Sequence, residues 1–254
     1  MSAGAYRLGE LLFEGDGLRL CRAVRRADGC PVLLRMAPGG GERAAAGLRR
    51  EYELRAELDW PGVVRPLALE IVAGAPTLVL EDFGGVTLTA LGFPLALPRF
   101  CELAAAVAAR LAEVHGRGLL HTDVRPPHIL VDPATGATRL TGFGLAARAP
   151  REQQILSDTR LLAGALPYLS PEGTGRINRS VDARSDLYAL GVTLYQALTG
   201  ALPFQARDAL EWVHCHIARR PVPPGDVVPA LAPPTAPRRS STKARRITGR
   251  RWPR

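Results

Sequence analysis

The sequence predicts an α+β fold built from two lobes, a small lobe rich in strands followed by a larger lobe rich in helices. Short runs of alternating apolar and polar residues, separated by turns that contain Gly, dominate residues 1–83. Apolar segments with a spacing near 3.6 residues dominate the part that follows. Because strands come first and helices second, the two kinds of element are expected to segregate, which is typical of an α+β protein.

The first lobe is expected to comprise residues 1–83. Residues 6–36 have the pattern of short strands joined by turns at 14–17 and 27–29. Residues 44–58 are rich in Arg, Glu, Leu and Ala and stop before Pro61, which predicts a helix. Two further strand-like runs follow, at 63–71 and at 77–83.

The second lobe is expected to comprise residues 84–226. An Ala-rich segment at 100–114 has helical apolar spacing and predicts a largely buried helix. Residues 186–199 predict a second helix, ended by Gly200, and residues 208–219 a third. We expect the apolar faces of 187–198 and 209–217 to stay partly uncovered, because no further apolar periodicity follows them.

The net charge of +9 is concentrated at the C-terminal end. Residues 233–254 hold eight of the 33 Lys and Arg residues and no acid, so the remainder has 25 basic residues against 24 acidic ones. We interpret residues 227–254 as a basic disordered tail, the product of a reading-frame shift or of a truncated gene end, with a basic arm for polyanions as the alternative. A nucleic-acid partner is not expected for the body of the chain.

Several classes of protein are disfavoured by composition. No run of about 18 apolar residues predicts a membrane span, and no apolar signal-peptide core follows the N-terminal residues. The four cysteines are scattered, which disfavours a zinc site or a disulfide framework. His214, Cys215 and His216 are adjacent on a predicted helix and therefore do not converge on a metal. The expected location is the cytoplasm.

The segment 121–130 (HTDVRPPHIL), followed by 140–144 (LTGFG), is the most specific motif of the chain. Together with 166–179, 180–204 and 212–221, it resembles the eukaryotic-like serine/threonine protein kinases of bacteria, above all the kinase domains at the N-termini of large multidomain sensor histidine kinases. The resemblance implies a bilobal protein-kinase-like fold, ATP as the ligand, and a protein substrate or signalling partner.

The resemblance also assigns site residues. Asp123 stands at the position of the catalytic base, and Arg125 replaces the Lys that neutralises the transferring phosphate. Arg35 and Glu51 stand at the positions of the paired strand Lys and helix Glu. The remaining assignments are Gly15, the one glycine left of a Gly-rich loop in which Phe13 and Leu18 occupy the other positions, and a nucleotide-binding hinge at Glu81 to Phe83. His121, Glu172 and Asp186 are assigned structural roles, and Arg55 is expected to reach solvent.

Two positions depart from the family pattern where magnesium is held. His128 replaces an Asn and Gly142 replaces an Asp, so both protein ligands of the metal are absent. We expect His128 to be neutral and partly exposed rather than a transition-metal ligand. Two hypotheses follow: a degenerate, pseudokinase-like module with a regulatory role and weak ATP binding, or a working ATP-dependent serine/threonine kinase that uses Asp123 as base.

Overall fold

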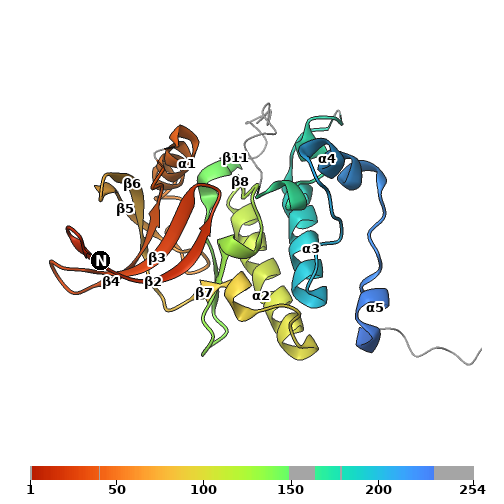
Figure 1. The fold of residues 1–254 in the computed structure, drawn as a ribbon, viewed down its shortest axis with the longest axis horizontal. Coiled ribbons are helices and arrows are strands. Elements are labelled where there is room, and N and C mark those ends of the chain that lie inside the picture. Colours follow the sequence, from red (N-terminus) through yellow and green to blue (C-terminus); the bar gives the residue numbers. More distant parts are fainter. Residues whose placement is uncertain (1, 40, 149–163, 178, 232–254) are drawn as a thin grey trace, which may run out of the picture.

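The computed structural model describes residues 2–39, 41–148, 164–177 and 179–231. Of the tail predicted at 227–254, residues 232–254 lie outside the described residues, whereas helical turns lie at Pro224–Val227 and Pro229–Leu231. The chain forms two lobes, with the strand-rich part and α1 in one and the remaining helices in the other (Figure 1). The predicted α+β, bilobal arrangement is confirmed.

The first lobe is built on a six-stranded antiparallel sheet with the order β1-β2-β3-β4-β6-β5. Its strands are β1 (Ser2–Ala3), β2 (Tyr6–Gly15), β3 (Leu18–Arg25), β4 (Pro31–Met36), β5 (Pro66–Val72) and β6 (Ala75–Glu81). The β2–β3 turn uses Asp16 and Gly17 at φ 55° and 74°, and the β5–β6 turn uses Ala73 and Gly74 at φ 51° and 79°. Left-handed turn residues match the twist of antiparallel strands, which explains both hairpins.

Helix α1 (Glu42–Glu53) is shorter than the predicted 44–58 segment. It ends where the chain turns, so that Leu54 and Leu58 enter the hydrophobic core of the second lobe. Its inner face crosses the loop after β10 closely, because a Cβ on Gly144 would lie 3.0 Å from Gly47 Cα. Arg55 is exposed, as predicted, and its guanidinium lies 4.5 Å from the centre of the Tyr52 ring.

The second lobe is organised around two long helices. Its helices are α2 (Leu97–Gly116), α3 (Ala183–Thr199), α4 (Ala209–Ala218) and α5 (Pro224–Val227). Its short strands are β7 (Val86–Thr87), β8 (Leu119–Leu120), β9 (Ile129–Val131), β10 (Thr138–Leu140) and β11 (Ala147–Arg148). Single 3₁₀ turns lie at Leu88–Leu91, Pro126–His128, Phe143–Leu145, Leu166–Tyr168, Glu172–Thr174 and Pro229–Leu231.

Helices α2 and α3 begin and end for local reasons. Every third or fourth residue of α2 is buried, namely Leu103, Val107, Leu111 and Val114, which gives one core-facing stripe. Asp182 caps α3 in a capping box with Ser185, and Gly200 ends it at φ 81°. The predicted helices are confirmed, with boundaries that differ by a few residues.

The two lobes meet across a joint hydrophobic cluster. Leu20, Leu33 and Leu80 of the sheet belong to the same buried cluster as Leu130 of β9. Arg22 of β3 fastens the segment between the lobes, since its guanidinium lies 2.7 and 2.8 Å from the two carboxylate oxygens of Asp82 and donates to the Gly85 carbonyl oxygen at 2.7 Å. The lobes are therefore in apolar contact, and a partly buried ion pair joins β3 to the segment that connects them.

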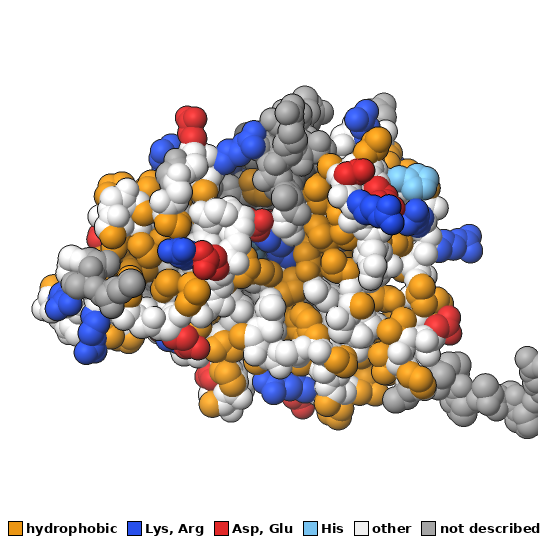
Figure 2. All heavy atoms as spheres, viewed as in Figure 1, with side chains coloured by type: hydrophobic (Ala, Val, Ile, Leu, Met, Phe, Trp, Pro, Cys, Tyr) orange, Lys and Arg blue, Asp and Glu red, His pale blue; other side chains and the backbone are white. Residues whose placement is uncertain are grey.

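Apolar side chains also gather on the surface of the second lobe. Leu187 and Leu210 are 54% and 70% exposed, and Ile217 is 44% exposed, in agreement with the expectation for these helix faces. Figure 2 shows hydrophobic side chains gathered between the lobes, with charged groups recessed among them.

Within the described residues, no helix combines the length and the apolar character that a membrane crossing requires.

Candidate active site

The loop between β8 and β9 carries the candidate catalytic residues. Asp186 of α3 fixes its backbone, because the carboxylate accepts hydrogen bonds from the amides of His121 and Thr122 at 2.8 and 2.7 Å. Nε2 of His115 also lies 2.8 Å from this carboxylate. Thr122 has φ 63°, an unusual value for a β-branched residue, and its hydroxyl donates to the Leu145 carbonyl oxygen. The predicted anchoring role of Asp186 is confirmed.

His121 packs inside this loop. Its ring lies 4.4 Å from the Phe143 ring, centre to centre, and its Nε2 lies 3.1 Å from the Thr141 carbonyl oxygen. The side chain is completely buried. This is the structural role that the sequence predicts for His121.

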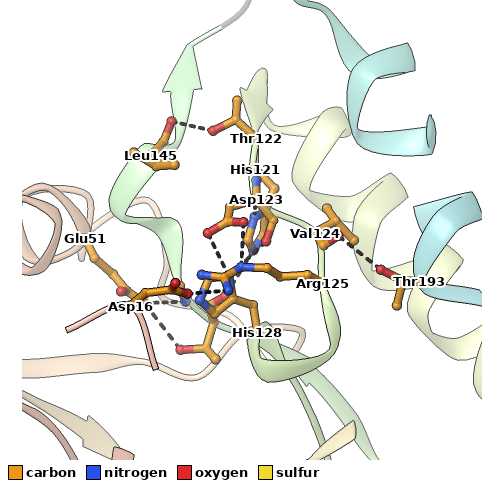
Figure 3. A network of polar contacts seen from close by, with 12 residues as sticks. Asp16, Glu51, His121, Thr122, Asp123, Val124, Arg125, His128, Leu145 and Thr193 are labelled. Atoms are coloured by element: carbon orange, nitrogen blue, oxygen red, sulfur yellow. Dashed lines mark hydrogen bonds and ion pairs between the residues drawn. The ribbon is translucent and has the colours of Figure 1, made fainter. Parts of the chain in front are cut away.

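Asp123, Arg125 and Asp16 form a chain of ion pairs (Figure 3). Nε of Arg125 donates to Asp123 Oδ1 at 2.8 Å, and a terminal nitrogen donates to Asp16 Oδ2 at 2.5 Å. Burial opposes the charge of Arg125, but the charges of Asp123 and Asp16 more than offset it and raise the pKa of the guanidinium. Asp123, the predicted base, and Arg125, the predicted phosphate-neutralising residue, therefore neutralise each other's charge. Asp16 of the β2–β3 turn also offsets the charge of Arg125.

Arg35 of β4 and Glu51 of α1 form the predicted ion pair. Their side chains are 5% and 2% exposed, and the donor and acceptor atoms lie 2.6 Å apart. Arg35 also donates to the Thr141 hydroxyl at 2.9 Å, and Glu51 accepts from the Gly142 amide at 2.9 Å. The pair therefore holds α1 against the loop that follows β10.

His128 occupies the space next to Gly142. A Cβ on Gly142 would lie 2.5 Å from Cγ of His128, and Gly142 has φ 83°. Nδ1 of His128 lies 2.9 Å from the Asp123 carbonyl oxygen, a distance at which it donates a hydrogen bond. The prediction of a partly exposed His128 is wrong, because the ring is buried against this glycine. The absence of a side chain at 142 is what makes room for it.

The neutral state predicted for His128 agrees with its surroundings. Burial lowers the pKa of His128 well below its usual value, and the charges of Arg125 and Arg35 lower it further. Burial also lowers the pKa of His216, which lies between Tyr188 and the Leu166 carbonyl oxygen.

These shifts predict a loss of stability in acid. Below about pH 6.5, the usual pKa of histidine, the unfolded chain binds protons that buried His128 and His216 do not bind. The free energy of unfolding should therefore fall as pH is lowered below this value, by at most about 1.4 kcal/mol per pH unit for each histidine. Urea denaturation between pH 7 and 5 measures the slope, and His128→Asn should reduce it.

His214→Asn removes an exposed histidine from α4 and serves as the control. A slope that is unchanged by His128→Asn would contradict the burial of a neutral imidazole at this position. His214 is exposed, whereas His216 is buried.

The other predicted nucleotide-binding residues take no part in the Arg35–Glu51 pair or in the ion pairs of Arg125. Glu81 binds Arg65 at 2.9 Å and Arg139 at 3.1 Å, and Arg139 also lies 4.4 Å from the centre of the Phe83 ring. Gly15 ends β2, and a Cβ there would lie 2.7 Å from the edge of the Phe13 ring. The side chains of Glu81 and Phe83 thus face Arg139, whereas Asp82 of the predicted hinge binds Arg22.

Arg35 and His128 both line the same two cavities. The larger, of ≈ 380 Å³, lies beneath α1 and is lined by charged groups (Asp16, Arg35, Glu51, Asp123, Arg125) and by small apolar residues of α1. The smaller, of ≈ 10 Å³, lies under Phe13 and Leu20 beside Arg35 and His128. A space of that size holds about one water molecule. In this conformation the smaller space is therefore too narrow for a nucleotide.

Sequence reasoning missed Asp16 and Thr141. Asp16 lies 109 positions from Arg125 in the chain, and in sequence it is an ordinary turn residue between two glycines. Thr141 is an unremarkable position before Gly142, yet its hydroxyl joins Arg35 to the loop. Neither residue carries a sequence signal for its partner.

A strand-rich lobe with a strand-to-helix ion pair, closed over a loop that presents an Asp and a cation, defines a protein-kinase-like domain. Residues 7–229 match the family model of the protein kinase domain. The chain therefore belongs to the protein kinase domain family.

The relatives are bacterial serine/threonine kinases. The chain is 35% identical over 237 residues to the DNA damage-responsive serine/threonine-protein kinase RqkA of Deinococcus radiodurans, with 90% of this chain and 35% of the relative covered. It is 33% identical over 229 residues to the serine/threonine-protein kinase PknB of Mycobacterium tuberculosis, covering 86% and 36%. The chain thus spans about a third of the length of these relatives.

The family in general uses ATP together with magnesium. Magnesium prefers oxygen ligands, whereas Gly142 offers no side chain and His128 offers nitrogen. In the part of the chain that the structure describes, no group of three or more His, Cys, Asp or Glu residues is arranged to hold a metal ion. These residues do not fit the family's magnesium site.

Proposed function

We propose that this chain is a degenerate serine/threonine protein kinase domain that acts by binding a signalling partner and does not transfer phosphate. The observation that carries the proposal is the packing of the His128 ring into the space beside Gly142. Phosphoryl transfer depends on positioning and on neutralisation of charge by metal ions, so the loss of both metal-ligand positions removes the main source of rate enhancement.

Nucleotide binding is proposed to be weak and nearly independent of magnesium. Arg35 and Arg125 already bind carboxylates, so a phosphate has to displace these contacts or share the guanidinium groups with them. The ≈ 10 Å³ space beneath Phe13 must also widen before a nucleotide enters. Both changes reduce the apparent affinity, because the binding-competent state is only a fraction of the population.

The alternative, an active kinase with Asp123 as base, has one specific observation in its favour. The Arg35–Glu51 pair is assembled and α1 lies against the loop after β10, which is the arrangement that kinase activity requires. Oxygen atoms of the nucleotide and of water would then have to replace both protein ligands of the metal.

A phosphotransfer assay separates the two functions. The purified chain is incubated with radiolabelled ATP, magnesium or manganese, and a generic basic-protein substrate, with Asp123→Asn as the control. We expect no turnover above that of the control, against about 1–100 per second for typical kinases. A thermal shift with ATP should be small and equal with and without magnesium. Magnesium-dependent turnover that Asp123→Asn abolishes would establish the alternative.

A further inference from the structure

The β2–β3 turn reaches into the candidate site through one carboxylate. Asp16 lies at the tip of the hairpin at φ 55°, and its side chain binds Arg125 although the two residues come from different lobes. The Asp16 side chain is 28% exposed and that of Arg125 is 8% exposed, so the ion pair lies at the entrance of the site. A carboxylate paired with Arg at 2.5 Å occupies one of the positions from which Arg binds a phosphate oxygen.

A second element meets the same carboxylate. Gly164, at the start of the segment that leads to Ser170, lies so close to Asp16 that a Cβ on Gly164 would overlap the carboxylate oxygens. Asp16 is therefore enclosed by Arg125 on one side and by the Gly164 backbone on the other. A side chain at 164 would be incompatible with the ion pair as it stands.

Behind Asp16 lies the ≈ 380 Å³ cavity beneath α1. Asp16, Arg35, Arg125 and Ala165 line it, together with the small residues Ala44, Ala46 and Gly47 on its α1 side. This volume is that of a small-ligand site. Its lining holds four arginines (Arg35, Arg43, Arg50, Arg125) and three acids (Asp16, Glu51, Asp123), so withdrawal of the Asp16 carboxylate leaves an excess of positive charge that an anion would match.

We propose that Asp16 is an internal competitor for an anion site centred on Arg125, and that a phosphate-bearing small molecule enters the cavity by displacing the Asp16 carboxylate and lifting the hairpin. The proposal deepens the proposed function, on which it rests, by naming what the site binds and what regulates access. In the closed state the Asp16 carboxylate of the hairpin binds Arg125. When the hairpin lifts, Arg125 is exposed to anions from the solvent.

Binding of inorganic pyrophosphate, measured by calorimetry on the full chain at one fixed salt concentration, tests the proposal. Asp16→Asn keeps the shape of the residue, and Asn tolerates a positive φ, so the turn should fold. We expect this variant to bind pyrophosphate about tenfold or more tightly than the parent chain, because the closed state no longer competes. Arg125→Met in the same background should abolish the gain.

Two further variants separate competition from simple loss of charge. Glu14→Gln removes the same charge from the same hairpin, but Glu14 pairs with Arg19 at the surface, so its affinity should stay within twofold of the parent. Gly164→Ala keeps the Asp16 charge and displaces the carboxylate, so it should tighten binding in the same direction as Asp16→Asn.

Any of three outcomes would contradict the proposal that Asp16 competes for Arg125. These are equal pyrophosphate affinities of Asp16→Asn and the parent chain, the same gain of affinity in Glu14→Gln, or no binding of pyrophosphate by any variant. Magnesium-dependent phosphotransfer by Asp16→Asn, together with tighter binding, would support the competitor and contradict the proposed loss of catalysis. The two proposals therefore fail in distinguishable ways.

Discussion

Replacement of Glu51 by alanine is expected to lower the free energy of unfolding by about 3–5 kcal/mol, since it leaves the buried Arg35 guanidinium without its counter-charge. The variant also removes the acceptor of the Gly142 amide. For a domain of this size such a loss corresponds to a drop in Tm on the order of 10 °C. Urea and thermal denaturation measure both quantities.

A surface pair provides the matched control. Glu57 binds Arg148, with side chains that are 36% and 53% exposed, and Glu57→Ala should cost at most about 1 kcal/mol. The double variant Arg35→Met, Glu51→Leu should be more stable than Glu51→Ala, because apolar residues remove the uncompensated charge. Equal costs for Glu51→Ala and Glu57→Ala would contradict a buried, structural role for the Arg35–Glu51 pair.

Gly142→Asp alone is expected to destabilise the domain by about 2–4 kcal/mol. This is the sum of the cost of placing a non-Gly residue in the left-handed backbone conformation and the cost of overpacking against the His128 ring. The new Cβ would lie 2.5 Å from His128 Cγ. The substitution that would restore a family metal ligand thus damages the fold. Chemical denaturation of the single variant measures the cost.

The double variant His128→Asn, Gly142→Asp should recover about 1 kcal/mol or more, because the smaller amide vacates the space. Gly74→Asp is the control for the backbone term, since Gly74 has φ 79° and no heavy atom within 4 Å of a Cβ. If Gly142→Asp costs no more than Gly74→Asp, the overlap with His128 does not exist.

The fold could be predicted largely from local signals. The Gly-containing turns, the segment that ends before Pro61 and the apolar stripe of α2 each specify their element with neighbouring residues alone. The end of α1 could not be predicted, because Leu54 and Leu58 leave the helix to reach the core of the other lobe. Tertiary packing decides that boundary.

The parts of the candidate site that could be predicted are the positions whose residue type and motif already indicate a chemical role. Arg35, Glu51, Asp123 and Arg125 line one cavity, while Glu81 and Phe83 lie beside Arg139 and remain predictions as nucleotide contacts. The burial of His128 and the reach of Asp16 could not be predicted. Each depends on a contact between segments whose proximity only the folded chain creates.

The fastening of the interlobe segment by Arg22 has a mechanical consequence. In many two-lobed proteins a ligand enters when the lobes swing apart about the connecting segment. Here Arg22 spans from β3 to Asp82 and Gly85, and Arg139 ties β10 to Glu81, so rigid-body rotation must break several charged contacts at once. Bending of the tip of the β2–β3 hairpin breaks the Asp16–Arg125 pair and leaves these interlobe contacts in place, so it is expected to be the softer motion. The contacts thus favour opening of the site by the tip of one hairpin over opening at the joint between the lobes.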